Sequence, residues 1–99
     1  MLDLATVRCE QFAACLNQDF EIVTKGDPVT LQLVEARPWG PDQPGAARKP
    51  FNLKFRGPPP LRLPQGVYKL TNAEMGEMEV FLVQIAADQT SSTFEAVFN

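Results

Sequence analysis

The 99-residue sequence is long enough for one domain and too short for a second hydrophobic core. Its 44% hydrophobic and 21% charged residues are typical of a globular protein and exclude a disordered chain. The net charge is −3, and histidine, the commonest general base and zinc ligand, is absent, which makes catalysis a weak expectation. We therefore expect a single domain over 1–99 that is not an enzyme and holds no cofactor or metal.

The N-terminal segment has the period of an amphipathic helix. Its apolar residues recur at the i, i+3, i+4, i+7 spacing of one helical face. These residues are Cys9, Phe12, Ala13 and Leu16. The pattern predicts a short helix over 4–16, with Asp3 or Thr6 as its N-cap and Asn17 as its C-terminal stop.

After residue 17 the apolar period falls to two, which is the period of a strand with one buried face. The predicted strands cover 20–22, 29–33, 51–56, 68–70, 78–85 and 94–98. The turn Lys25-Gly26-Asp27-Pro28 makes the first two an antiparallel hairpin. The strand 78–85 is apolar on both faces around Leu82, so we expect it to be the most buried.

The spacing of the strands indicates the architecture. About six short strands joined mostly by short polar turns are typical of an antiparallel sheet that forms a small barrel or a sandwich. The predicted fold is thus mainly β, with the one short N-terminal helix plugging one end. Periodicity alone does not choose between barrel and sandwich.

A long connection over 38–50 interrupts the strands with four prolines and two glycines. Loops of this length are uncommon in compact domains and are usually functional or disordered. It holds the only tryptophan, Trp39, beside Arg37, and this pair of residue types is enriched at binding hot spots. The candidate partner-binding residues are therefore Arg37, Trp39, Arg48 and Lys49. The alternative is that Trp39 folds back over an open barrel end.

Charge is distributed in blocks along the chain: net −4 over 1–36, +6 over 37–69 and −5 over 70–99. A basic middle segment suggests nucleic acid, but acidic flanks in the same small domain and a pI of 4.8 argue against such a partner. Two readings remain. The basic residues pair with glutamates across strands, or a basic side and an acidic side meet a protein partner or other copies of the chain.

Two further groups are candidates for chemistry. Glu77 and Glu79 share one strand face near Glu74, where they could hold a divalent cation, although a solvated face is the simpler reading. Cys9 and Cys15 could be reactive thiols, but burial explains Cys9 better, and their six-residue spacing opposes an intra-helix disulfide. The unpaired cysteines and the lack of a leader or membrane-length apolar run predict a cytoplasmic protein without membrane contact.

The second half of the sequence holds four short motifs: Leu63-Pro64-Gln65-Gly66-Val67-Tyr68, Gly76, Phe81-Leu82-Val83 and Phe94-Glu95-Ala96-Val97-Phe98-Asn99. In these motifs it resembles a family of small, uncharacterised bacterial β-rich domains. Gln84 and Phe94 depart from the usual Pro and Tyr of the family. The resemblance implies a domain of unknown function. The resemblance also implies relatives that often accompany genes resembling those of phage-tail collar proteins, which would favour a structural or assembly role.

These observations predict a non-enzymatic protein-interaction or assembly module, accessory to a phage-tail-like structure. Its contacts would use a sheet edge, the terminal strand or the proline-rich loop. The alternative is a β-barrel that binds a small ligand in its mouth. An enzyme with carboxylate or cysteine chemistry is the third and weakest hypothesis.

Overall fold

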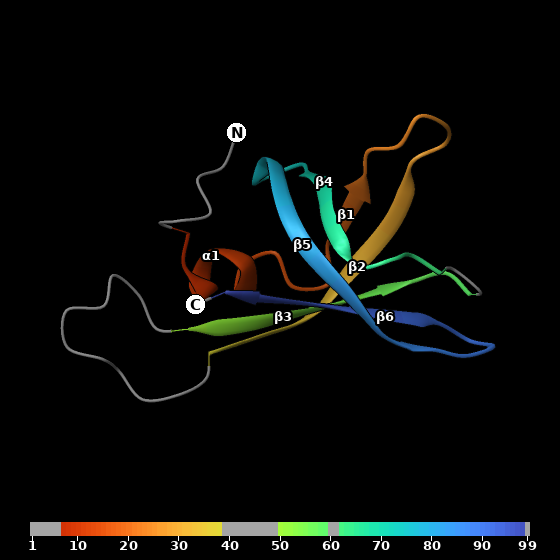
Figure 1. Cartoon of the computed structure of the whole chain (residues 1–99). Helices are drawn as coiled ribbons and strands as arrows, with labels where there is room; N and C mark the ends of the chain where they lie inside the picture. The colour runs from red at the N-terminus through yellow and green to blue at the C-terminus, as the bar shows by residue number, and fades with distance from the viewer. Residues whose placement is uncertain (1–6, 39–49, 60–61, 99) are drawn as a thin grey trace.

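The computed structural model describes residues 7–38, 50–59 and 62–98 and shows a small closed barrel with one short helix against it (Figure 1). The prediction of a mainly β fold with six antiparallel strands and an N-terminal helix is confirmed. Of the two architectures that the sequence left open, the strands form a barrel and not a sandwich. The elements are α1 (Cys9–Ala13), β1 (Asp19–Ile22), β2 (Val29–Pro38), β3 (Phe51–Gly57), β4 (Gly66–Asn72), β5 (Gly76–Ala87) and β6 (Ser92–Phe98).

Around the barrel the strands follow the order β1-β2-β3-β6-β5-β4, and each pair is antiparallel. The predicted hairpin between the first two strands is present, with Phe20 opposite Leu31. Closure depends on a short contact in which Glu21 and Ile22 of β1 pair with Thr71 and Leu70 of β4. Closing the sheet removes most of the unpaired strand edges that an open sheet would present.

The two longest strands, β2 and β5, each change partner along their length. Strand β2 pairs with β1 over 29–32 and with β3 over 32–38, while β5 pairs with β4 over 76–82 and with β6 over 83–87. The register shifts near each change, at Val34 in β2 and at Ile85 in β5. Such bulges bend a strand and increase its twist. The barrel therefore consists of two sheets that share β2 and β5.

Side chains that alternate inward from every strand fill the core. Its largest fully buried members are Phe12, Phe20, Phe51, Phe55, Phe94, Leu31, Leu33, Leu53, Leu70, Met78, Leu82 and Val7. The helix contributes Phe12, whose ring lies 5.6 Å from that of Phe98, 5.9 Å from that of Phe51 and 6.4 Å from that of Phe20. Helix α1 therefore plugs one end of the barrel, as the sequence indicates.

The helix is shorter than the 4–16 predicted, because regular helix ends at Ala13 and residues 14–17 form a turn. This turn alters the predicted apolar face: Cys15 is buried, whereas Leu16 is 43% exposed. Arg8 is the N-cap, and its backbone N–H donates to Gln11 Oε1 at 2.8 Å. The caps predicted at Asp3 and Thr6 lie outside the described residues. Within the described ranges, no helix has the length and apolar character needed to cross a membrane.

The prediction that the strand 78–85 would be the most buried is wrong. Phe81 is 52% exposed and Ile85 47%, whereas β3 and β6 bury four of their seven residues each. The reason is that a closed barrel has a single core, so only one face of each strand is covered. An apolar run in the sequence shows which side chains are suited to burial. In the barrel, only those on the inner face of the strand are buried.

Candidate functional site

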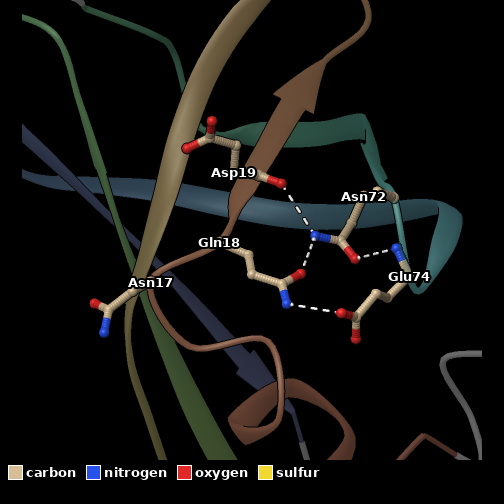
Figure 2. Close-up of a pocket in the computed structure, with 6 residues that line it drawn as sticks. Asn17, Gln18, Asp19, Asn72 and Glu74 are labelled. Carbon is tan, nitrogen blue, oxygen red and sulfur yellow. Dashed lines mark hydrogen bonds between the residues drawn. The ribbon is translucent and has the colours of Figure 1, made fainter.

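A polar cluster joins the β4–β5 turn to the segment between α1 and β1 (Figure 2). Its centre is Asn72, the last residue of β4, which is only 7% exposed. The Asn72 side-chain amide donates to the carbonyl oxygen of Asp19 at 3.0 Å and to Gln18 Oε1 at 3.2 Å. Its Oδ1 accepts from the backbone N–H groups of Glu74 and Met75, both at 2.9 Å. The first two bonds join the two segments, and the other two close the β4–β5 turn.

Glu74 and Cys15 extend this cluster. Gln18 Nε2 donates to Glu74 Oε1 at 3.0 Å, and the Cys15 thiol lies 3.7 Å from Glu74 Oε2 and 3.9 Å from Asn72 Oδ1. Burial raises the pKa of the Cys15 thiol, and the neighbouring Glu74 carboxylate, which accepts its proton in a hydrogen bond, raises it further. A thiolate is the reactive form of cysteine, so this environment opposes nucleophilic chemistry.

Two open hollows lie beside the cluster. The first, of about 390 Å³, is lined by Asn17, Gln18, Asp19, Asn72, Ala73 and Glu74. The second, of about 330 Å³, is lined by Asp19, Glu21, Thr71, Asn72 and Ala73. The polar atoms of Asn72 that border them already have partners, so they are not available to orient a ligand. In the described part of the chain, no three His, Cys, Asp or Glu side chains gather as metal ligands do.

A different surface lies on the outer face of β4 and β5. Val67 and Phe81 stand directly opposite each other across this strand pair, 63% and 52% exposed. One row away, Val23 is 50% exposed and donates its backbone N–H to the carbonyl of Lys69. Large apolar side chains that share an exposed face are informative, because single exposed ones are normal whereas contiguous ones mark contact surfaces. We call Val23, Val67 and Phe81 the apolar patch.

Most exposed charged residues on the strands that carry the apolar patch are acidic. The exposed charged residues of β1, β4, the first half of β5 and the turn between β4 and β5 are Asp19, Glu21, Lys69, Glu74, Glu77 and Glu79. The single lysine among them pairs with Glu77, at 3.1 Å from Lys69 Nζ to Glu77 Oε1. Both side chains are more than 40% exposed, so this pair contributes little stability. The exposed charge on these strands is therefore predominantly acidic.

Of the four residues predicted to bind a partner, the structure describes one. Arg37 is exposed near the end of β2, opposite Asn52 of β3. Trp39, Arg48 and Lys49 lie outside the described residues. The Asn52 Oδ1 atom is buried and accepts no hydrogen bond from the described residues. Arg37 is on the sheet that contains β3 and β6, so it does not belong to the apolar patch.

The remaining candidate groups from the sequence are placed as follows. Glu77 and Glu79 are exposed, in agreement with a solvated strand face. The cysteines are both free, and burial followed by the charge of Glu10 raises the pKa of Cys9. Cross-strand charge pairing occurs, since Lys54 of β3 lies 3.5 Å from Glu35, its partner position on β2.

Two hydrogen bonds hold the Leu63–Tyr68 motif in place where the chain enters β4. The Tyr68 hydroxyl donates to the carbonyl of Pro64 at 2.5 Å, and the Leu63 N–H donates to Gln84 Oε1 at 3.0 Å. Gln84 thus ties this segment to β5 through a side chain that proline would lack.

The sequence did not reveal the apolar patch, because Val67 and Phe81 become neighbours only through the pairing of β4 with β5.

The model of one protein family, described as a domain of unknown function (DUF6916), matches residues 7–98 of the chain. This agrees with the resemblance to an uncharacterised domain family seen in the sequence motifs. Neither the curated proteins nor the solved structures include a significant match to the chain.

Proposed function

Because this chain belongs to the DUF6916 family, whose description assigns no activity, we propose from its surface that it is a non-enzymatic protein-interaction module. The observation that carries the proposal is the apolar patch, in which Val67 and Phe81 are opposite each other and more than half exposed. Exposed aromatic and branched side chains at the centre of a polar rim are the usual anatomy of a protein–protein contact.

The charge around the patch indicates the chemistry of the partner. The exposed charged residues on β1, β4, the β4–β5 turn and the first half of β5 are five carboxylates and one lysine, so a basic protein surface is complementary and a polyanion is not. The partner we propose is a protein with basic residues around an apolar centre, in line with an assembly role such as the phage-tail-like context that the sequence resemblance implies. The cytoplasmic location stays a prediction from the sequence.

The ligand-binding alternative receives less support. The inward side chains of all six strands and Phe12 form one buried cluster in the barrel interior. The hollows that border Asn72 lie outside that cluster, and their central amide is already hydrogen-bonded. A protein surface is therefore the better interpretation of this barrel.

A position-specific photo-crosslinking experiment tests the proposal. A photoreactive phenylalanine analogue replaces Phe81 in one variant and Leu16, which is 43% exposed on the helix side, in another. In cells of the source organism we expect position 81 to crosslink to one discrete protein and position 16 to give no such product. Equal products at both positions, or none at position 81, would refute this contact surface.

A further inference from the structure

Among the described residues, the first half of β5 has a strand on only one side. Residues 76–82 pair with β4, whereas β6 pairs with β5 only from Val83 onward. No other described helix or strand pairs with β5. In Figure 1, β5 passes from its pairing with β4 to its crossing with β6. The backbone groups of 76–82 that point away from β4 therefore form an open strand edge next to Phe81.

We infer that this edge binds an extended segment of the partner protein as an additional antiparallel strand. The inference rests on the proposed function and names its binding mode. Strand addition uses backbone hydrogen bonds for affinity and alternate side chains for selectivity. The sequence of β5 supplies both, because its exposed face presents Glu77, Glu79 and Phe81 in alternation with the inward-facing Met78 and Val80.

The order of those side chains specifies the partner segment. An antiparallel strand places its residues directly opposite those of β5, so selectivity comes from cross-strand pairs. An apolar residue is favoured opposite Phe81, and a lysine or arginine two positions later is favoured opposite Glu79. Glu79 has no salt bridge within the described residues, whereas Glu77 pairs with Lys69. The partner segment is thus apolar-x-basic in an extended conformation.

A second copy of this chain fits the edge poorly. Two β5 edges related by a two-fold axis at Glu79 would place the two Glu79 carboxylates opposite each other, and an axis at Met78 would place Glu77 opposite Glu79. Like charges directly opposite are destabilising. An axis at Val80 sets Phe81 against Glu79, which gives neither an apolar nor a charge pair. An axis at Phe81 sets the two phenylalanines opposite each other, but it places Glu79 opposite Val83, which β6 already pairs. The charge pattern therefore favours a different, basic segment over self-pairing.

The test is a selection of randomised linear twelve-residue peptides, displayed on phage, for binding to the full chain. We expect enriched peptides that share the apolar-x-basic pattern. Binding of a synthetic enriched peptide should fall about tenfold or more in Glu79→Lys and in Phe81→Lys, since a lost interaction of about 1.4 kcal/mol is tenfold in affinity. Ile85→Lys is the matched control, because Ile85 is 47% exposed on the half of β5 that β6 already pairs. Its affinity should be unchanged.

Backbone methylation separates strand addition from a side-chain contact. N-methylation of alternate amides on the bound edge of the peptide should abolish binding, and N-methylation of the intervening amides should not. If binding depends on Phe81 but neither methylated peptide loses affinity, strand addition is wrong while the proposed interaction surface stands. If selection enriches no peptide, or Ile85→Lys weakens binding as much as Glu79→Lys, the open edge is not the site.

Discussion

At the scale of single residues, Asn72 has the largest structural role outside the apolar core. It is nearly buried and makes four hydrogen bonds that connect β4, the β4–β5 turn and the start of β1. Removing one partner from a buried group costs more than the hydrogen bond itself, because the other partner is left without one. This residue is therefore a sensitive point for folding.

We expect Asn72→Ala to lower the free energy of unfolding by about 1 to 3 kcal/mol, since it leaves two backbone N–H groups and one carbonyl unpaired. Urea unfolding followed by circular dichroism measures the loss. Gln18→Ala is the matched control. Gln18 belongs to the same cluster but is more exposed than Asn72, so its loss should lower the free energy of unfolding by less than about 1 kcal/mol. Equal losses in the two variants would contradict the central position of Asn72.

Asp88 provides a pH-dependent contribution in the turn before β6. Its Oδ1 accepts hydrogen bonds from the Thr90 hydroxyl and N–H, both at 2.7 Å, and from the Ser91 N–H at 2.9 Å. These hydrogen bonds hold the pKa of Asp88 below its ordinary value of 3.8, and the bond from the Thr90 hydroxyl has the largest effect. A carboxylate with a lowered pKa stabilises the fold above the unfolded-state pKa, and this stabilisation is lost as the pH falls through the folded-state pKa.

We therefore expect the urea midpoints of wild type and Asp88→Asn to differ at pH 5 and above and to converge as the pH falls below 3.8. Repeating the unfolding series between pH 5 and pH 2 checks the direction. A difference that grows on acidification would show that the Asp88 carboxylate is not favoured in the folded state.

At the scale of elements, period and turn chemistry predict most of the structure. The alternation in 51–56 and 94–98 predicts β3 and β6 to within about two residues, because each has one face in the core and one in solvent. The helix is less well predicted, since its apolar spacing continues past the point where the chain turns into β1. The register shifts at Val34 and Ile85 have no signal in the period, because a bulge is defined by the strand opposite.

Gly76 is a direct test of turn chemistry. It has a φ of +81°, and no atom lies within 4 Å of a Cβ built there, so substitution would strain the backbone without a clash. Gly76→Ala should cost about 1 to 2 kcal/mol. Gly26→Ala is the matched control, since Gly26 has equal space and a φ outside the left-handed region, and it should be neutral or stabilising by about 0.4 to 1 kcal/mol. Thermal unfolding of the two variants distinguishes these outcomes.

At the scale of the whole molecule, strand pairing decides where the exposed chemistry lies. The charge blocks of the sequence suggest a basic side and an acidic side. In the barrel, Lys54 of the basic block pairs with Glu35 of the first acidic block, and Lys69 pairs with Glu77 of the last. Part of the charge asymmetry is thus neutralised across strands. Among the described residues, exposed Arg37, Arg56 and Arg62 of the basic block and Glu79 of the last acidic block have no ion pair. Of the residues expected to bind a partner, only Arg37, which directly precedes the loop over 38–50, lies in the described structure.

The sequence by itself determined the class of fold, the number of strands and the plugging helix, because these follow from local period, glycine and proline placement, and the volume that 99 residues are able to enclose. Only the tertiary structure decided between barrel and sandwich, which half of β5 has an open edge, and that Phe81 is exposed opposite Val67. The physical reason is that burial is set by the single core of the closed barrel. A side chain is inside or outside according to the strands on either side of it, and those strands are distant in the sequence.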